Sequence, residues 1–156
     1  MQSDRAPIRV RGLAIPSLLL SLLAEGRWKH PGDAALARVM PWFEDPLHFL
    51  TSAPAMVRES SSLDYFTEDD ATAQLFRQAR GSEQAEAVDL PWLDVERAFF
   101  VAVNENAGDD VAIAFDYRTD PADPRVVASD FWTAPGRCSW REVAPTFSAL
   151  VVAFDL

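Results

Sequence analysis

The second half of the chain alternates apolar runs with turn-forming clusters, and this pattern predicts a β-sheet. Residues 99–104 are apolar on both alternating faces, which is typical of a central strand covered on both sides. Further strands are predicted at 111–117, 125–131 and 138–143. Residues 106–110 (NAGDD) form a hairpin-type turn cluster between the first two strands.

A final helix is predicted to start at Pro145, because proline is tolerated in the first turn, where its missing N–H has no partner to lose. Four apolar residues then recur at helical spacing and should form one stripe that packs on the sheet. They are Phe147, Leu150, Val151 and Phe154.

The first half predicts helices that precede the sheet. Pro16 opens a helix with a broad leucine face, and Gly26 ends it at a position where positive φ suits glycine. A short helix capped by Asp33 follows, and a capping-box pattern predicts another helix over residues 67–80. Because Pro54 would interrupt a helix, residues 47–62 are expected to be loop with one short helix.

These elements predict an α+β fold class and a single domain over residues 1–156. We expect a mainly antiparallel sheet of about four to six strands, with N-terminal and C-terminal helices packed on it. Residues 1–12 are polar and arginine-rich, which predicts a loosely held arm. Residues 82–87 are polar and predict a mobile segment.

Charge is spread unevenly along the chain, whose net charge is −10. Residues 1–80 carry ten acids and nine bases, whereas residues 81–156 carry fourteen acids and five bases. A strongly acidic sheet half argues against nucleic acid or an anionic membrane as partner. It favours either a basic protein partner or solubility alone, and the composition leaves both open.

Two features, the lone cysteine and the N-terminal apolar run, bear on the cellular compartment of the protein. Cys138 cannot form a disulfide within the chain, so a cytoplasmic location is expected. Its apolar neighbours favour a buried, inert thiol over a nucleophile. The leucine-rich run at 13–24 resembles the core of a signal peptide, but no small-x-small cleavage site follows it. We expect a buried amphipathic helix there.

The sequence contains no catalytic or metal-binding motif. His30 and His48 lack partners at metal-ligand spacing, and HExxH, CxxC and G-x-S-x-G are all absent. The glycines fall at predicted helix ends and turns, so no phosphate-binding loop is predicted. We therefore expect no cofactor, no metal and no enzymatic activity.

Acidic residues in the turns of the sheet half are the densest polar feature. Their spacing does not match a calcium loop, and aspartate in turns commonly bonds to its own backbone. Solvated turn residues that steer a basic partner are the favoured interpretation, and a small enzyme with a general acid/base pair is the alternative. The candidate partner-binding acids are Asp109, Asp110, Asp116, Asp120 and Asp123.

One aromatic pair is a candidate anchor for a partner. Trp42 and Phe43 lie between Pro41 and Pro46, in what must be irregular backbone. We expect this pair to be partly exposed, while most other tryptophans of the chain fill the core.

The order of the later motifs resembles SMI1/KNR4-like (SUKH superfamily) proteins. The shared pattern is a Gly-Asp turn into a strand ending in aspartate, and then a last strand leading to a Thr-Phe helix. The N-terminal Ile-Pro and leucine run, closed by Glu-Gly, is also similar. The residues that carry the resemblance are Gly108, Asp109, Asp116, Val126, Val127, Trp140, Ala144, Pro145, Thr146 and Phe147.

The resemblance implies an α+β fold without enzymatic activity. Bacterial members of this family are mostly immunity proteins that bind and neutralise polymorphic toxins, often nucleases, and eukaryotic members are regulatory scaffolds. The expected partner is thus a protein, specifically a basic toxin domain, and the alternative is an endogenous protein bound by a regulatory module.

Overall fold

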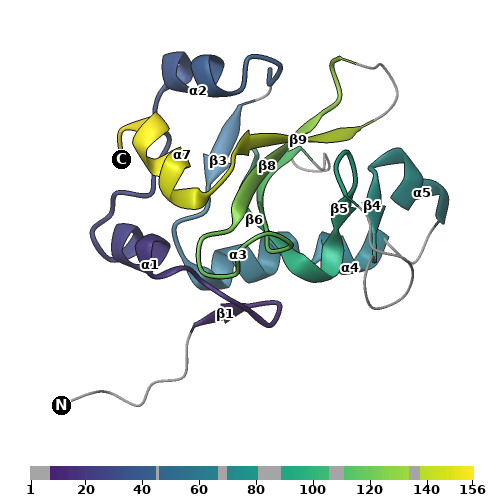
Figure 1. Cartoon of the computed structure of the whole chain (residues 1–156), viewed down its shortest axis with the longest axis horizontal. Coiled ribbons are helices and arrows are strands. Elements are labelled where there is room, and N and C mark those ends of the chain that lie inside the picture. Colours follow the sequence, from purple (N-terminus) through teal and green to yellow (C-terminus); the bar gives the residue numbers. More distant parts are fainter. Residues whose placement is uncertain (1–7, 45, 67–69, 81–88, 106–110, 134–137) are drawn as a thin grey trace.

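The computed structural model describes residues 8–44, 46–66, 70–80, 89–105, 111–133 and 138–156. Its centre is a five-stranded antiparallel sheet in the order β3-β6-β7-β8-β9 (Figure 1). The predicted α+β class is confirmed, and the first predicted strand is indeed internal to the sheet. The strands are β3 (Leu47–Phe49), β6 (Ala98–Asn104), β7 (Ala112–Asp116), β8 (Arg125–Asp130) and β9 (Ser139–Ala144).

Helices cover both faces of this sheet. α7 (Phe147–Phe154) contacts β8 and β9 on one face and packs against α2 (Asp33–Val39), whereas α3 (Ala53–Ser60) contacts β6. α1 (Ser17–Ala24) precedes Trp28, whose ring lies 5.7 Å from that of Phe147 in α7. α4 (Ser62–Phe66) and α5 (Asp70–Leu75) continue from α3 (Figure 1).

The apolar alternation of the strands explains this layering. Phe99 lies opposite Phe115 on the neighbouring strand, and Phe115 contacts Phe147 of α7 at 4.8 Å between ring centroids. Phe100 points to the other face, where it stacks on Trp140. The predicted stripe of α7 is buried as expected, so both faces of β6 belong to one core.

Two small sheets flank the large one. β1 (Arg9–Val10) and β2 (Leu13–Ala14) form an antiparallel hairpin, and β4 (Gln78–Ala79) pairs in parallel with β5 (Leu93–Asp94). A single 3₁₀ turn, η1 (Val95–Arg97), leads from β5 into β6. The expectation of a loose arm is wrong for residues 9–12, because Val10 is fully buried in the core.

Helix boundaries partly follow the sequence prediction. α1 ends as predicted, with Gly26 at φ +68°. The predicted cap at Asp33 is wrong, since Gly32 holds the N-cap position and Asp33 is the first residue of the helix. α7 begins after Thr146, whose side chain accepts a hydrogen bond from the Ala149 N–H, so Pro145 lies outside the helix.

The middle of the chain departs most from prediction. Residues 47–62 contain strand β3 as well as α3, and Pro54 lies in the first turn of α3, where it interrupts nothing. The helix predicted to reach residue 80 ends at Leu75, and the chain turns through Arg77 at φ +48° into β4. The Thr67 cap, the turn at 106–110 and the segment 82–87 lie outside the described residues.

Candidate partner-binding surface

Asp116 is not a surface acid, and the expectation that it contacts a partner is wrong. It ends β7 with 1% of its side chain exposed. Its Oδ1 accepts from Arg118 Nε at 2.8 Å, and its Oδ2 accepts from Arg125 Nη2 at 2.5 Å. Burial raises the pKa of the Asp116 carboxyl, but the hydrogen bonds from Arg118 and Arg125 outweigh that effect and the pKa is lowered.

These ion pairs connect three segments of the chain. Arg118 also donates to the Trp92 carbonyl at 2.9 Å, and Arg125 reaches Asp89 at 3.3 Å. The network of Asp116, Arg118 and Arg125 thereby joins the end of β7 and the start of β8 to the connector before β5. The role of Asp116 in this geometry is structural.

The remaining candidate acids are not brought together. Asp120 is exposed in the β7–β8 connection and accepts from the Ala122 N–H. Asp123 accepts from the backbone N–H and the hydroxyl of Ser148, which ties this connection to the first turn of α7. Asp109 and Asp110 lie outside the described residues. Within the described ranges, no group of three His, Cys, Asp or Glu residues is arranged to hold a metal ion.

Trp42 and Phe43 are partly exposed, as expected, and belong to a larger group of side chains. The Arg141 guanidinium lies 4.4 Å from the Trp42 ring centroid, and the Phe43 and Trp132 rings meet edge to face at 4.9 Å. We call Trp42, Phe43, Trp132 and Arg141 the aromatic–arginine cluster. All four side chains are partly or fully exposed.

The buried carboxylate of Asp130 supports this cluster through hydrogen bonds. Its Oδ2 accepts from Arg141 at 3.1 Å, while its Oδ1 accepts from the backbone N–H groups of Trp132 and Thr133. Burial raises the pKa of Asp130, but the hydrogen bonds from Thr133, Trp132 and Arg141 outweigh that effect. The pKa of this carboxyl is therefore below its usual range. Trp42 is fixed independently by donating from Nε1 to the Ser129 carbonyl at 3.3 Å.

Sequence reasoning found only half of the cluster. Trp132 and Arg141 lie 90 and 99 residues beyond Trp42, and only the tertiary fold brings them together with it. The available signal was the pair of predicted strands at 125–131 and 138–143, whose pairing would bring Asp130 close to Arg141. The position of the 41–46 segment over these strands has no local signature.

Exposed acids in this half of the chain outnumber the arginines available to neutralise them. Arg118, Arg125 and Arg141 are three of the five basic residues after position 80, and each is paired with an aspartate. Among the described residues after position 80, four exposed acids have no ion-pair partner. They are Glu105, Asp120, Glu142 and Asp155.

The other residues considered for chemistry have structural positions. Cys138 is fully buried, as predicted. His30 accepts from the Gly32 N–H through Nδ1, just before α2. His48 is exposed on β3, opposite Val103.

Comparisons with protein-family models, curated proteins and solved structures returned no match. No helix in the described ranges is both long and apolar enough to pass through a bilayer.

Proposed function

We propose that the chain is a non-catalytic protein-binding domain whose partner docks on the aromatic–arginine cluster. The observation that carries this proposal is the cluster itself: two tryptophans, a phenylalanine and an arginine, held in place at the surface by a buried carboxylate. Tryptophan and arginine are enriched among the residues that dominate binding energy at protein interfaces. Rigid aromatic side chains lose little conformational entropy on binding, which favours their use as anchors.

More specifically, the domain acts as an immunity protein that neutralises a toxin with a basic active-site face. Two observations support this step. The motifs at Gly108–Asp109 and Thr146–Phe147 resemble a family rich in immunity proteins, and the sheet half retains exposed acids after its arginines have been paired. Negative potential around an aromatic anchor would speed the encounter with a cationic partner. The proposed location is the cytoplasm, consistent with a single buried thiol.

Co-expression with a toxin tests this proposal. The toxin to test is the basic C-terminal domain of any large secreted protein whose gene is found next to that of this chain, and growth of the host reports its neutralisation. Wild type should restore growth, whereas Trp42→Ala and Phe43→Ala should weaken binding by about thirtyfold or more each, the effect of losing an interface hot spot.

The matched control is Val152→Ala, which removes an apolar side chain that is 80% exposed on α7. It should protect like wild type. If both cluster variants are folded by circular dichroism and protect as well as wild type, the cluster is not the docking surface. If the wild-type protein neither binds nor protects against the neighbouring toxin and instead captures an endogenous enzyme, the regulatory-scaffold alternative replaces the immunity function.

A further inference from the structure

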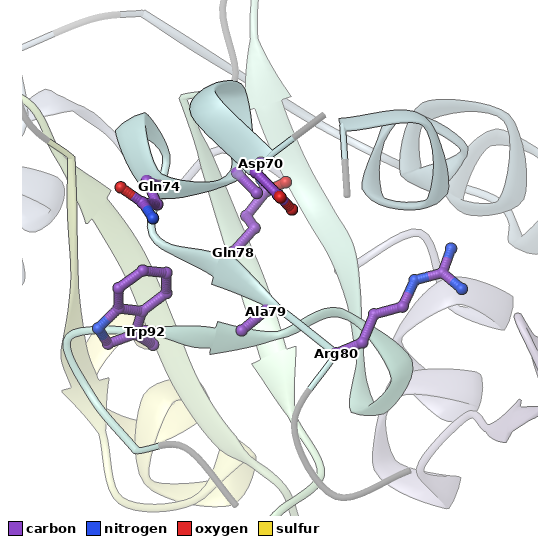
Figure 2. A pocket seen from close by; sticks show the side chains of 7 residues that line it. Asp70, Gln74, Gln78, Ala79, Arg80 and Trp92 are labelled. Atoms are coloured by element: carbon purple, nitrogen blue, oxygen red, sulfur yellow. The ribbon is translucent and has the colours of Figure 1, made fainter. Parts of the chain in front are cut away.

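A second site lies between α5 and the small parallel sheet, and none of its lining residues belongs to the aromatic–arginine cluster. It is a pocket of about 310 Å³, within the size range of small-ligand pockets. Figure 2 shows Gln78 extending from β4 toward Asp70, with Gln74 and Trp92 on one side of it and Arg80 on the other. The pocket is lined by Asp70, Ala73, Gln74, Gln78, Ala79, Arg80 and Trp92.

Gln78 is the unusual member of this lining. Its side chain is 1% exposed, yet neither Oε1 nor Nε2 makes a hydrogen bond with any described part of the chain. Buried amide groups are almost always paired, because leaving a donor and an acceptor unsatisfied costs stability. An apolar residue of similar size would fit β4 without that cost, so glutamine at this position points to a binding role.

Trp92 supplies another wall of the same pocket. Its backbone N–H donates to the Asp89 carbonyl, and its own carbonyl accepts from Arg118, the arginine paired with Asp116. The Arg77 guanidinium lies 5.7 Å from the Trp92 ring centroid. The ring is therefore held before any ligand arrives, which lowers the entropy lost on binding.

The charges of the pocket favour a neutral ligand. Asp70 and Arg80 contribute one charge of each sign, and the other lining residues are uncharged at neutral pH. A carboxamide offers one N–H donor beside one C=O acceptor, so its natural complement is another planar group with the same pair in the opposite order. Such a group can also lie flat against an indole ring.

We propose that this pocket binds a small neutral ligand through an amide edge, with Gln78 as the paired donor and acceptor and Trp92 as the stacking surface. Two sources share this chemistry: an open-chain carboxamide, as in an asparagine or glutamine side chain, and a cyclic amide, as in a pyrimidine base. The inference does not rest on the proposed immunity function or on the aromatic–arginine cluster.

Nuclear magnetic resonance titrations of the ¹⁵N-labelled full chain test the proposal. Propionamide represents the open-chain source and uracil the cyclic source. Methyl propionate and 1,3-dimethyluracil are matched controls without the N–H donor. We expect the Gln78 side-chain amide and the Trp92 indole N–H signals to shift and saturate at about millimolar concentration with at least one amide probe. Which amide probe binds identifies the source.

Two results would overturn the proposal: neither amide probe shifts these signals, or the donor-free analogues shift them equally. The variant Gln78→Met gives a second readout that needs no ligand. Because it removes two unsatisfied groups, it should raise Tm by about 2–4 °C while abolishing the probe-induced shifts. Gln74→Met, at an exposed amide of the same pocket, should leave Tm unchanged. A lower Tm for Gln78→Met would show that the amide is satisfied in the folded protein and would contradict the proposal.

Discussion

Asp116 shows how a full charge is kept inside the sheet. A lone buried carboxylate is strongly disfavoured, but here both oxygens accept charged hydrogen bonds from Arg118 and Arg125. The two arginines are themselves nearly buried, with side chains 12% and 13% exposed. The three residues therefore form one unit, in which each charge depends on the others.

Replacing Asp116 by asparagine should destabilise the fold strongly. Asp116→Asn keeps the shape but leaves the buried arginines with uncompensated charge, and we expect the free energy of unfolding to fall by about 3–5 kcal/mol. Urea denaturation measures the change. The control Asp120→Asn, at an exposed acid of the same connection, should alter it by less than about 0.5 kcal/mol. A loss below about 1 kcal/mol for Asp116→Asn would mean that the ion pairs add little.

The lowered pKa of Asp116 also predicts how stability depends on pH. Above about pH 5 the carboxyl is ionised in both the folded and the unfolded chain, so it gives no slope. As pH falls below about 4, the ordinary pKa of aspartate, the unfolded chain takes up the proton first and the stabilisation is progressively lost. The free energy of unfolding should therefore decrease toward acid.

Denaturation curves between about pH 6 and pH 2 check this slope. Asp116→Asn should reduce the slope by up to about 1.4 kcal/mol per pH unit, the value for one proton. Asp130, whose pKa is also lowered, keeps part of the slope in the variant. An identical slope in the variant would show that Asp116 does not titrate differently in the folded and unfolded chain.

The burial of Asp116 was accessible to sequence reasoning in part. The alternation in 111–117 places Asp116 on the same face as Ala112 and Ala114, two small residues that indicate a covered face. What the sequence does not reveal is that Arg118 and Arg125 fold back onto this carboxylate. That contact depends on the β7–β8 register, in which Asp116 lies opposite Arg125.

At the scale of elements, α7 is too short to be stable by itself and depends on side-chain hydrogen bonds at its N-terminus. Its eight residues are too few for a stable isolated helix, so packing and capping must hold it. The Thr146 hydroxyl accepts from the Ala149 N–H, and Asp123 accepts from the Ser148 N–H. Two of the N–H groups that a helix start leaves unpaired are satisfied in this way.

Removal of the Thr146 cap should cost about 1 kcal/mol of folding stability. Thermal unfolding of Thr146→Ala should show Tm lowered by about 2–4 °C, whereas Thr51→Ala, at an exposed threonine outside any helix, should unfold like wild type. If the two variants unfold at the same temperature, Asp123 and the apolar stripe alone hold the start of α7.

Elements that depend on distant pairing were the ones that sequence reasoning missed. α1, β6 and α7 carry strong local periodicity and were predicted to within a few residues. β3 and β4 have three and two residues, which is too short for a periodic pattern, and each exists because β6 or β5 offers an edge to pair with. Tertiary pairing likewise overrides the helix-forming sequence around Arg77.

At the scale of the whole molecule, the acidic surface and the aromatic–arginine cluster have separate roles in the proposed binding. Charge acts over about 8–10 Å at physiological salt and governs how fast partners meet, whereas buried aromatic contacts govern how long they stay together. Composition gives the net charge of −10 on which the first role depends, although the same charge also fits solubility alone. The second required the structure, since the cluster combines residues that lie about ninety to a hundred positions apart in the sequence.

Ionic strength should therefore change association much more than dissociation. Raising salt from about 0.02 M to about 0.5 M should slow association with the proposed basic toxin domain by about tenfold or more, with little change in the dissociation rate. Surface plasmon resonance separates the two rates. Trp42→Ala should show the opposite behaviour, with faster dissociation and nearly unchanged association. An association rate that does not vary with salt would exclude electrostatic steering.

The buried thiol of Cys138 is a natural probe of local unfolding. Cys138 is the only thiol in the chain and lies fully buried immediately before the edge strand β9. A thiol-reactive dye can therefore couple to it only after this region has opened locally. The labelling rate, divided by that of a free thiol, yields the opening equilibrium without any engineered reporter. Binding of the proposed partner at the nearby Arg141 would lower the labelling rate. One dye could therefore follow both local opening and complex formation.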